Sequence, residues 1–212
     1  IMIRDLVLSR SGQGIRIADS ENVTILNVTV SNNRVGISTE SIGWRVNCSI
    51  LDSKIVNNED GLSLLCSNAS TVHSNTISNN TVGMDIGGMS TRNLVTDNLI
   101  SNNREYGIGI YYLSSGGNIL YRNSFIDNTK QVYKEYTISP NIWDNGYPSG
   151  GNYWSDYSGV DLYSGPYQNE TGGDGIGDTP YVIDASNQDN YPFTAHDVAV
   201  TNVTLSKTVV SK

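Results

Sequence analysis

Short alternations of apolar and polar residues recur at a regular spacing along the first two-thirds of the chain. Each recurrence carries a glycine followed by an apolar residue, and successive glycines lie 22, 25, 22 and 24 residues apart. A period in the low twenties that contains only short alternations predicts stacked β-coils. Helical repeats would need long amphipathic stretches, and a leucine-rich repeat would need a leucine scaffold. The recurring pairs of glycine and apolar residue are Gly14-Ile15, Gly36-Ile37, Gly61-Leu62, Gly83-Met84 and Gly107-Ile108.

Aligning the repeats places apolar residues in four inward rows, because alternate residues of a strand point to the same side. Residues 1–133 are therefore predicted to form an all-β, right-handed parallel β-helix of five to six coils, with 22–25 residues per coil. Each coil would bury its side chains against the coils on either side. The rows are Ile15, Ile37, Leu62, Met84, Ile108; Ile17, Thr39, Leu64, Ile86, Ile110; Ile25, Ile50, Val72, Val95, Leu120; and Val30, Ile55, Ile77, Ile100, Phe125.

Polar residues also align between coils, and asparagine predominates among them. Identical amides stacked about 4.8 Å apart both donate and accept hydrogen bonds along the stack. The sequence therefore predicts two asparagine ladders, and the weaker alternative is that these asparagines merely mark turns. A separate pair of asparagines recurs once in each repeat and serves to align the coils. The ladders are Asn75, Asn98, Asn123, after Val28 and Ser53, and Asn93, Asn118, after Val23, Cys48 and Ser70. The pairs are Asn32-Asn33, Asn57-Asn58, Asn79-Asn80, Asn102-Asn103 and the degraded Asp127-Asn128.

The repeat ends near Lys134, where the composition changes. All five prolines lie beyond this point, together with two of the three tryptophans. Residues 134–193 carry nine acidic residues against one base, which favours cations over nucleic-acid phosphates as partners. Because an open β-helix end exposes core and strand edges, this segment is predicted to be an irregular aromatic and acidic cap.

Four motifs in the predicted cap are Trp143-Asp144-Asn145, the run from Gly151 to Tyr157, the run from Asp174 to Tyr181, and Tyr191-Pro192. They closely resemble the C-terminal signature of NosD-like β-helix proteins, whose repeats are grouped as carbohydrate-binding and sugar-hydrolase modules. With the repeats, the resemblance covers about residues 1–193. It implies a β-helix outside the cytoplasmic membrane, of the type found on archaeal cell surfaces.

The copper-related role of the named NosD proteins does not transfer by this resemblance. Copper handling requires clusters of methionine, histidine or cysteine. Here these side chains are scattered, and Met84 falls in a core row. The methionines and histidines are Met2, Met84, Met89, His73 and His196.

The acidic cap contains a candidate calcium site. Asp174 and Asp178 are separated by glycines, and carboxylate and carbonyl oxygens are the ligands that Ca²⁺ takes. Asp156, Asp161 and Asp144 are candidates to complete the shell. The resembling family often has a further aspartate where this chain has a glycine, at 172. The alternative is that these carboxylates accept hydrogen bonds from turn amides.

A catalytic reading would need paired carboxylates on one outer face. Asp52 and Asp97 align two coils apart, with Ser74 between them, hence roughly 9–10 Å apart. That separation is the outer limit for an inverting glycosidase. Aspartate at a coil corner is more often a turn residue, so we expect no enzymatic activity and no organic cofactor.

Several side chains bear on the environment of the protein. Cys48 is predicted to be buried. The sequence does not decide whether Cys48 and Cys66 form a disulfide. Sequons for N-glycosylation suit an extracellular glycoprotein, although several would arise by chance in this composition. The sequon asparagines are Asn22, Asn27, Asn47, Asn68, Asn79, Asn169 and Asn202.

These features favour a non-catalytic structural or adhesive module of an extracellular surface protein, such as a surface layer, sheath or filament. The alternative is a carbohydrate-binding or polysaccharide-cleaving β-helix, which outward aromatic residues or carboxylates in a groove would favour. Residues 194–212 have the composition of a linker and the first strand of a following or partner β-sandwich. Through residues 195–212 we expect contacts with neighbouring copies or other domains. Glycans are further candidate partners, whereas nucleic acid and membrane insertion are not expected.

Overall fold

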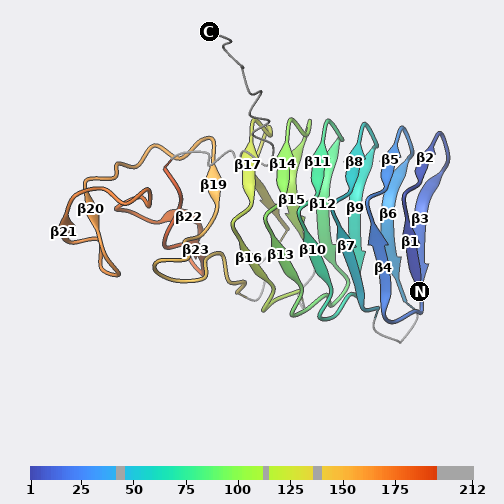
Figure 1. Ribbon diagram of the computed structural model, residues 1–212, viewed down its shortest axis with the longest axis horizontal. Coiled ribbons are helices and arrows are strands. Elements are labelled where there is room, and N and C mark those ends of the chain that lie inside the picture. The colour runs from blue at the N-terminus through green and yellow to red at the C-terminus, as the bar shows by residue number, and fades with distance from the viewer. Residues whose placement is uncertain (42–45, 112–114, 136–139, 195–212) are drawn as a thin grey trace, which may run out of the picture.

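The computed structural model describes residues 1–41, 46–111, 115–135 and 140–194 (Figure 1). These residues form strands and turns without a helix, so none of them lies in a helix that spans a membrane. Three parallel sheets wind into a β-solenoid of about five turns, which confirms the predicted right-handed parallel β-helix. The segment 195–212, predicted to be a linker and strand, lies outside the described residues.

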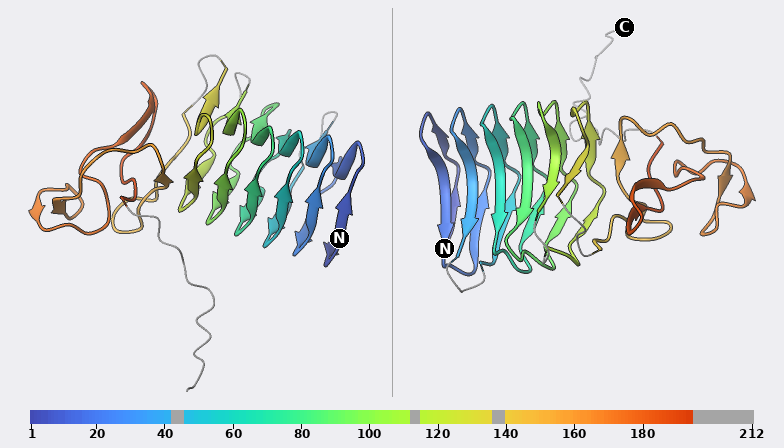
Figure 2. Two further views of the ribbon diagram at one scale, coloured as in Figure 1. Left: turned by 90° about the horizontal axis from the view of Figure 1, so that it is seen from above. Right: turned by 180° about the vertical axis from the view of Figure 1, so that it is seen from behind.

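Each coil contributes one strand to each of three sheets, and Figure 2 shows the coils stacked one after another along the rod. Sheet A contains β1 (Met2–Arg4), β4 (Val23–Leu26), β7 (Cys48–Leu51), β10 (Thr71–His73), β13 (Leu94–Thr96) and β16 (Ile119–Tyr121). Sheet B contains β2 (Val7–Ser9), β5 (Thr29–Ser31), β8 (Lys54–Val56), β11 (Thr76–Ser78), β14 (Leu99–Ser101), β17 (Ser124–Ile126) and β19 (Tyr153–Trp154). Sheet C contains β3 (Gln13–Ala18), β6 (Val35–Glu40), β9 (Asp60–Leu65), β12 (Val82–Gly87), β15 (Tyr106–Ile110) and β18 (Val132–Lys134).

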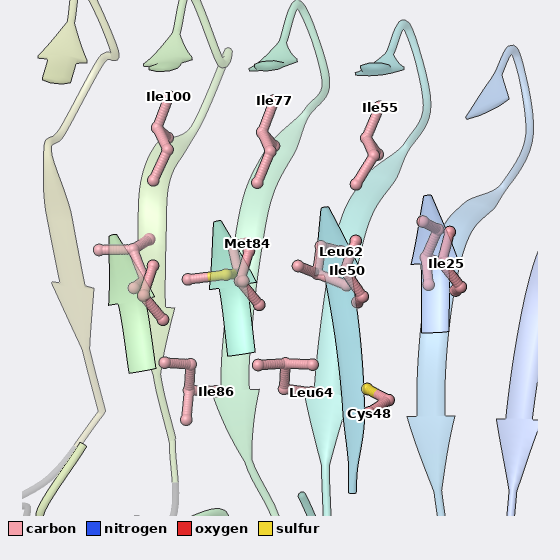
Figure 3. Packing of buried hydrophobic residues seen from close by; sticks show 14 of the residues in the cluster. Ile25, Cys48, Ile50, Ile55, Leu62, Leu64, Ile77, Met84, Ile86 and Ile100 are labelled. Carbon is pink, nitrogen blue, oxygen red and sulfur yellow. The ribbon is translucent and has the colours of Figure 1, made fainter. Parts of the chain in front are cut away.

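The four predicted inward rows are confirmed by the strand register. In sheet A, Ile25 pairs with Ile50, which in turn pairs with Val72. The rows of sheets B and C continue in the same way from coil to coil, and most of their side chains are fully buried (Figure 3). Stacking aliphatic side chains in this way removes both faces of each coil from water, which is the main stabilising contribution.

Asparagine ladders line all three corners of the coil, one more than the sequence predicted. At the corner between sheets A and B, the Asn75 amide donates to Asn98 Oδ1 at 3.0 Å, and Asn98 donates to Asn123 at 2.9 Å. The predicted ladder between sheets C and A runs through Asn93 and Asn118. The third ladder, between sheets B and C, uses the second residue of each asparagine pair: Asn33, Asn58, Asn80, Asn103 and Asn128.

The first residue of each asparagine pair has a different task. Asn57, Asn79 and Asn102 have φ angles of 58°, 57° and 54°, in the left-handed region. Asparagine and aspartate tolerate this region better than other non-glycine residues because their short polar side chains bond locally. Each pair therefore combines a turn residue with a ladder residue, and this explains why the pair recurs.

The cap closes the C-terminal end of the core with aromatic rings. β19 adds to sheet B beside β17, and its Trp154 stacks between Phe125 and Tyr181, with 4.3 Å between ring centroids on each side. Trp143 is also buried against Trp154. Two short hairpins complete the cap: β20 (Tyr163–Ser164) with β21 (Glu170–Thr171), and β22 (Tyr181–Asp184) with β23 (Asn187–Asp189).

Each ladder ends on a residue of the cap or on a residue shortly before the cap in the chain. Asn123 donates to Asn152, and the fully buried Asp189 then accepts the Asn152 backbone N–H at 2.7 Å. The ladder between sheets C and A continues through Asn141 to Asn187. The ladder between sheets B and C ends on Gln131, whose amide donates to Ser155. The cap therefore satisfies the last polar group of every stack.

Candidate functional site

Three tyrosines gather on the outer side of sheet C at the end nearest the cap. Tyr106 lies in β15, Tyr111 directly follows β15, and Tyr133 lies in β18. The Tyr106 and Tyr133 rings stack with 5.1 Å between centroids and 19° between planes. The centre of the Tyr111 ring lies 6.3 Å from that of Tyr106 and 5.8 Å from that of Tyr133. The Tyr111 hydroxyl contacts the Tyr106 hydroxyl. We call these three residues the tyrosine cluster.

Tyr133 is the last of three residues that pair from coil to coil on sheet C. The other two are Asp85 and Gly109. A Cβ at Gly109 would lie only 2.6 Å from Asp85 Oδ1 and 2.7 Å from the Tyr106 ring. Glycine at this position is therefore what lets the rings approach the carboxylate. The Asp85 Oδ1 atom is buried and has no hydrogen-bond partner.

Burial, with a smaller contribution from the charge of Asp60, raises the pKa of Asp85 to about 7. Burial likewise raises the pKa of Tyr106. Removing a carboxylate from water disfavours its charged form, and no base forms an ion pair with Asp85 in the described part of the chain. Sheet C therefore holds a carboxyl group that changes protonation near neutral pH.

A cavity of about 550 Å³ opens against the tyrosine cluster. Arg104 and Lys130 line it together with Glu105 and Glu135, so its formal charges balance. The Lys130 ammonium lies 5.5 Å from the centre of the Tyr133 ring, within cation–π range. Aromatic walls with a few polar groups are typical of small-molecule sites. The remaining lining residue is Thr129.

The five aspartates of the candidate calcium site accept hydrogen bonds in the cap. Asp161 accepts the Asp174 and Gly175 amides at 3.0 Å and 2.7 Å, and Asp178 accepts the Leu162 amide. Among the residues that the structure describes, no three acidic, histidine or cysteine side chains form a group able to hold a metal ion. Further hydrogen bonds join Asp174 to the Ile176 amide, Asp144 to the Gly146 and Asn190 amides, and Asp156 to the Tyr181 hydroxyl.

Calcium binding by the cap stays a prediction, and chelation tests it. If Asp174 and Asp178 bind Ca²⁺, a chelator lowers the melting temperature, because a ligand at a hundredfold excess over Kd stabilises by about 2.7 kcal/mol. Asp174→Ala should abolish that sensitivity, with Asp5→Ala, at the other end of the rod, as control. A melting temperature that does not respond to chelator would leave the carboxylates as turn acceptors.

Asp52 and Asp97 both lie at coil corners in the left-handed region, with φ angles of 48° and 57°. Asp97 forms an ion pair with Arg122 at 2.9 Å and lies 3.3 Å from His73 Nδ1. These φ angles are those of turn residues, and the Asp97 carboxylate belongs to a surface polar network with Arg122 and His73. That the pair has no catalytic role stays a prediction.

The cysteines and sequons occupy varied environments. Cys48 is buried, as expected, and both Cys48 and Cys66 are free thiols. The Asn47 amide donates to two backbone carbonyls, at 3.2 Å and 2.7 Å, so its nitrogen is engaged. Asn68 is half-buried, and Asn202 lies outside the described residues. The exposed sequon asparagines are Asn22, Asn27, Asn79 and Asn169.

Comparison with known families gives a match to the family described as "Periplasmic copper-binding protein (NosD)", over residues 1–159. The chain belongs to the NosD family. The match covers the coils and the first part of the cap, while the motifs from Asp174 onward lie beyond it. The periplasmic description of the NosD family agrees with the expected location outside the cytoplasm in a broad sense. No curated protein matches the chain.

The described residues do not fit the copper site that the NosD description implies. Met84 and Cys48 are buried in the core, and His73 Nδ1 lies 3.0 Å from Thr96 Oγ1. Met2 and Met89 are exposed on separate parts of the rod. Copper sites need several such ligands converging on one point, and no three histidine, cysteine or acidic side chains of the described residues form such a group. We therefore derive no function for this chain from copper.

Proposed function

We propose that this chain is a non-catalytic structural or adhesive module of an extracellular surface protein, held in a surface layer, sheath or filament. The observation that carries the proposal is the continuity of the rod. Three sheets and three hydrogen-bonded ladders join each coil to the next, and the cap closes them. A repeat rod of this kind is stabilised by contacts between neighbouring coils and suits the display of surfaces at a fixed spacing.

Further parts of the proposal concern the surroundings of the rod. An archaeal cell surface suits the resemblance of the cap motifs, and exposed sequons such as Asn79 would carry glycan there. Calcium held by Asp174 and Asp178 would stabilise the cap. Neighbouring copies or other domains would bind through residues 195–212.

The non-catalytic part of the proposal is tested with acidic polysaccharides. Incubation with polygalacturonate should give no unsaturated products, measured by ultraviolet absorbance, and no new reducing ends. The ion pair between Asp97 and Arg122 supports this expectation, because it engages the carboxylate of the candidate pair. Product formation that disappears in Asp52→Asn or Asp97→Asn, but persists in Asp127→Asn, would assign an enzyme instead.

Carbohydrate binding is a second candidate function, favoured by the tyrosine cluster. Outward aromatic side chains beside a cavity are the feature expected of a saccharide-binding β-helix rather than of a plain rod. Tyr133 is half-buried and lines the cavity together with Tyr106 and Tyr111. An adhesive module that binds saccharide through this face would combine both functions, since binding at the outer surface leaves the rod unchanged.

A further inference from the structure

We propose that the tyrosine cluster forms a subsite for an uncharged sugar ring, which packs on Tyr133 and excludes acidic saccharides. This inference deepens the second candidate function and rests on it. It assigns the site to named residues and restricts the ligand to neutral, hydroxyl-rich rings. Three features support it: the arrangement of the rings, the charges around the cavity and the carboxyl group beneath.

The ring arrangement leaves Tyr133 as the contact surface. Tyr106 is 9% exposed and stacks on Tyr133, so it supports that ring and offers little surface of its own. Tyr133 is more exposed and lines the cavity. A tyrosine ring offers an apolar face and a polar edge with little loss of conformational freedom. A sugar ring that packs its C–H face on Tyr133 would take the place of the Lys130 ammonium, which lies over this ring at 5.5 Å from its centre, while the sugar hydroxyl groups reach the rim.

Polar groups at the rim match a ligand that both donates and accepts hydrogen bonds. Arg104 and Lys130 donate, whereas the carboxylates of Glu105 and Glu135 accept. Two bases and two acids leave no net charge to attract an ion of either sign. Sugar hydroxyl groups both donate and accept, so they satisfy such a mixed rim.

Acidic residues beyond the rim disfavour a negatively charged ligand. Asp85 lies beneath the rings: a Cβ on Gly109 would be 2.6 Å from its Oδ1 atom and 2.7 Å from the Tyr106 ring, and this Oδ1 atom has no hydrogen-bond partner. The charge of Asp60 also acts on Asp85. A uronate carboxylate placed on Tyr133 would approach these groups in a partly buried setting, where it is repelled by whichever of them carries a charge. The cavity of about 550 Å³ has the size of ordinary ligand sites, so charge rather than volume selects the ligand.

Calorimetric titration of the whole chain with three sets of oligosaccharides tests the proposal. The probes are neutral gluco- and manno-oligosaccharides, oligogalacturonate as the acidic set, and chitosan oligosaccharides as the cationic set. We expect neutral probes to bind most tightly. Tyr133→Ala should weaken binding about tenfold or more, whereas Tyr133→Phe, which keeps the ring, should weaken it much less.

The matched control is Tyr121→Ala, which removes a partly buried tyrosine from β16 on sheet A. It should leave binding unchanged, and circular dichroism would show that each variant folds. If neutral sugars bind but Tyr133→Ala binds as well as the original chain, saccharide binding stands and this subsite is wrong. Tighter binding of the acidic or the cationic set would overturn the charge argument. If no set binds, both the subsite and carbohydrate binding as a function are refuted.

Discussion

Replacing Asn98 by alanine is expected to lower the free energy of unfolding by about 3–5 kcal/mol, because it orphans several buried groups at once. The Asn98 side chain accepts two hydrogen bonds from Asn75, at 2.9 Å and 3.0 Å. Its amide donates to Asn123 and to two backbone carbonyls, each at 2.9 Å. Alanine can supply none of these bonds. A urea titration followed by circular dichroism measures the loss.

The matched control is Asn102→Gly, four residues further along the same coil. Asn102 is exposed and has a φ of 54°, which glycine adopts without strain. This variant should change the free energy of unfolding by no more than about 0.5 kcal/mol. Equal losses in the two variants would mean that ladder and turn asparagines contribute alike, contrary to the geometry.

Trp154→Ala should cost a similar amount, about 3–5 kcal/mol, through loss of packing between the cap and the coils. Trp154 is 1% exposed and stacks against Phe125 on one side and Tyr181 on the other. Its indole N–H also donates to the buried Asp189 carboxylate at 2.9 Å. Removing the side chain opens a cavity and leaves that carboxylate with one donor fewer.

Tyr167→Ala serves as the control for the cap because Tyr167 is 84% exposed. Its melting temperature should match that of the original chain in a calorimetric scan, while that of Trp154→Ala should fall by several degrees. A Trp154→Ala variant that melts like the control would show that the cap does not contribute to the stability of the coils.

The inward rows were predictable because a stacked β-helix repeats one pattern. Once Gly36 and Gly61 were aligned, each alternate residue acquired a fixed direction, and Ile37 pairs with Leu62 as the alignment requires. The third ladder is not evident from the sequence, because Asn58 belongs to a pair of adjacent asparagines whose two members have the same residue type. The left-handed φ of Asn57 separates the two tasks, and a sequence does not display it.

The tyrosine cluster could not be predicted from the sequence for a different reason. Tyr111 and Tyr133 are separated by 22 residues, and only the register of β15 with β18 brings their rings to 5.8 Å. A signal was present, because Gly109 aligns with Asp85 and Tyr133 in successive coils. Predicting the ring contacts would also have required the side-chain directions on the outer face, where no packing pattern constrains them.

The ladders have a direction, and this direction governs how the protein can change in length. In each stack the side-chain amide donates toward the C-terminal end, as Asn75 does to Asn98. The final position therefore needs an acceptor, and in the ladder between sheets A and B the Asp189 carboxylate supplies it. Inserting or deleting a whole coil leaves every donor with an acceptor, whereas a partial coil leaves donors unmatched. Rods of this design can thus lengthen by duplication of single coils, in steps of about 4.8 Å, while the same cap continues to fit.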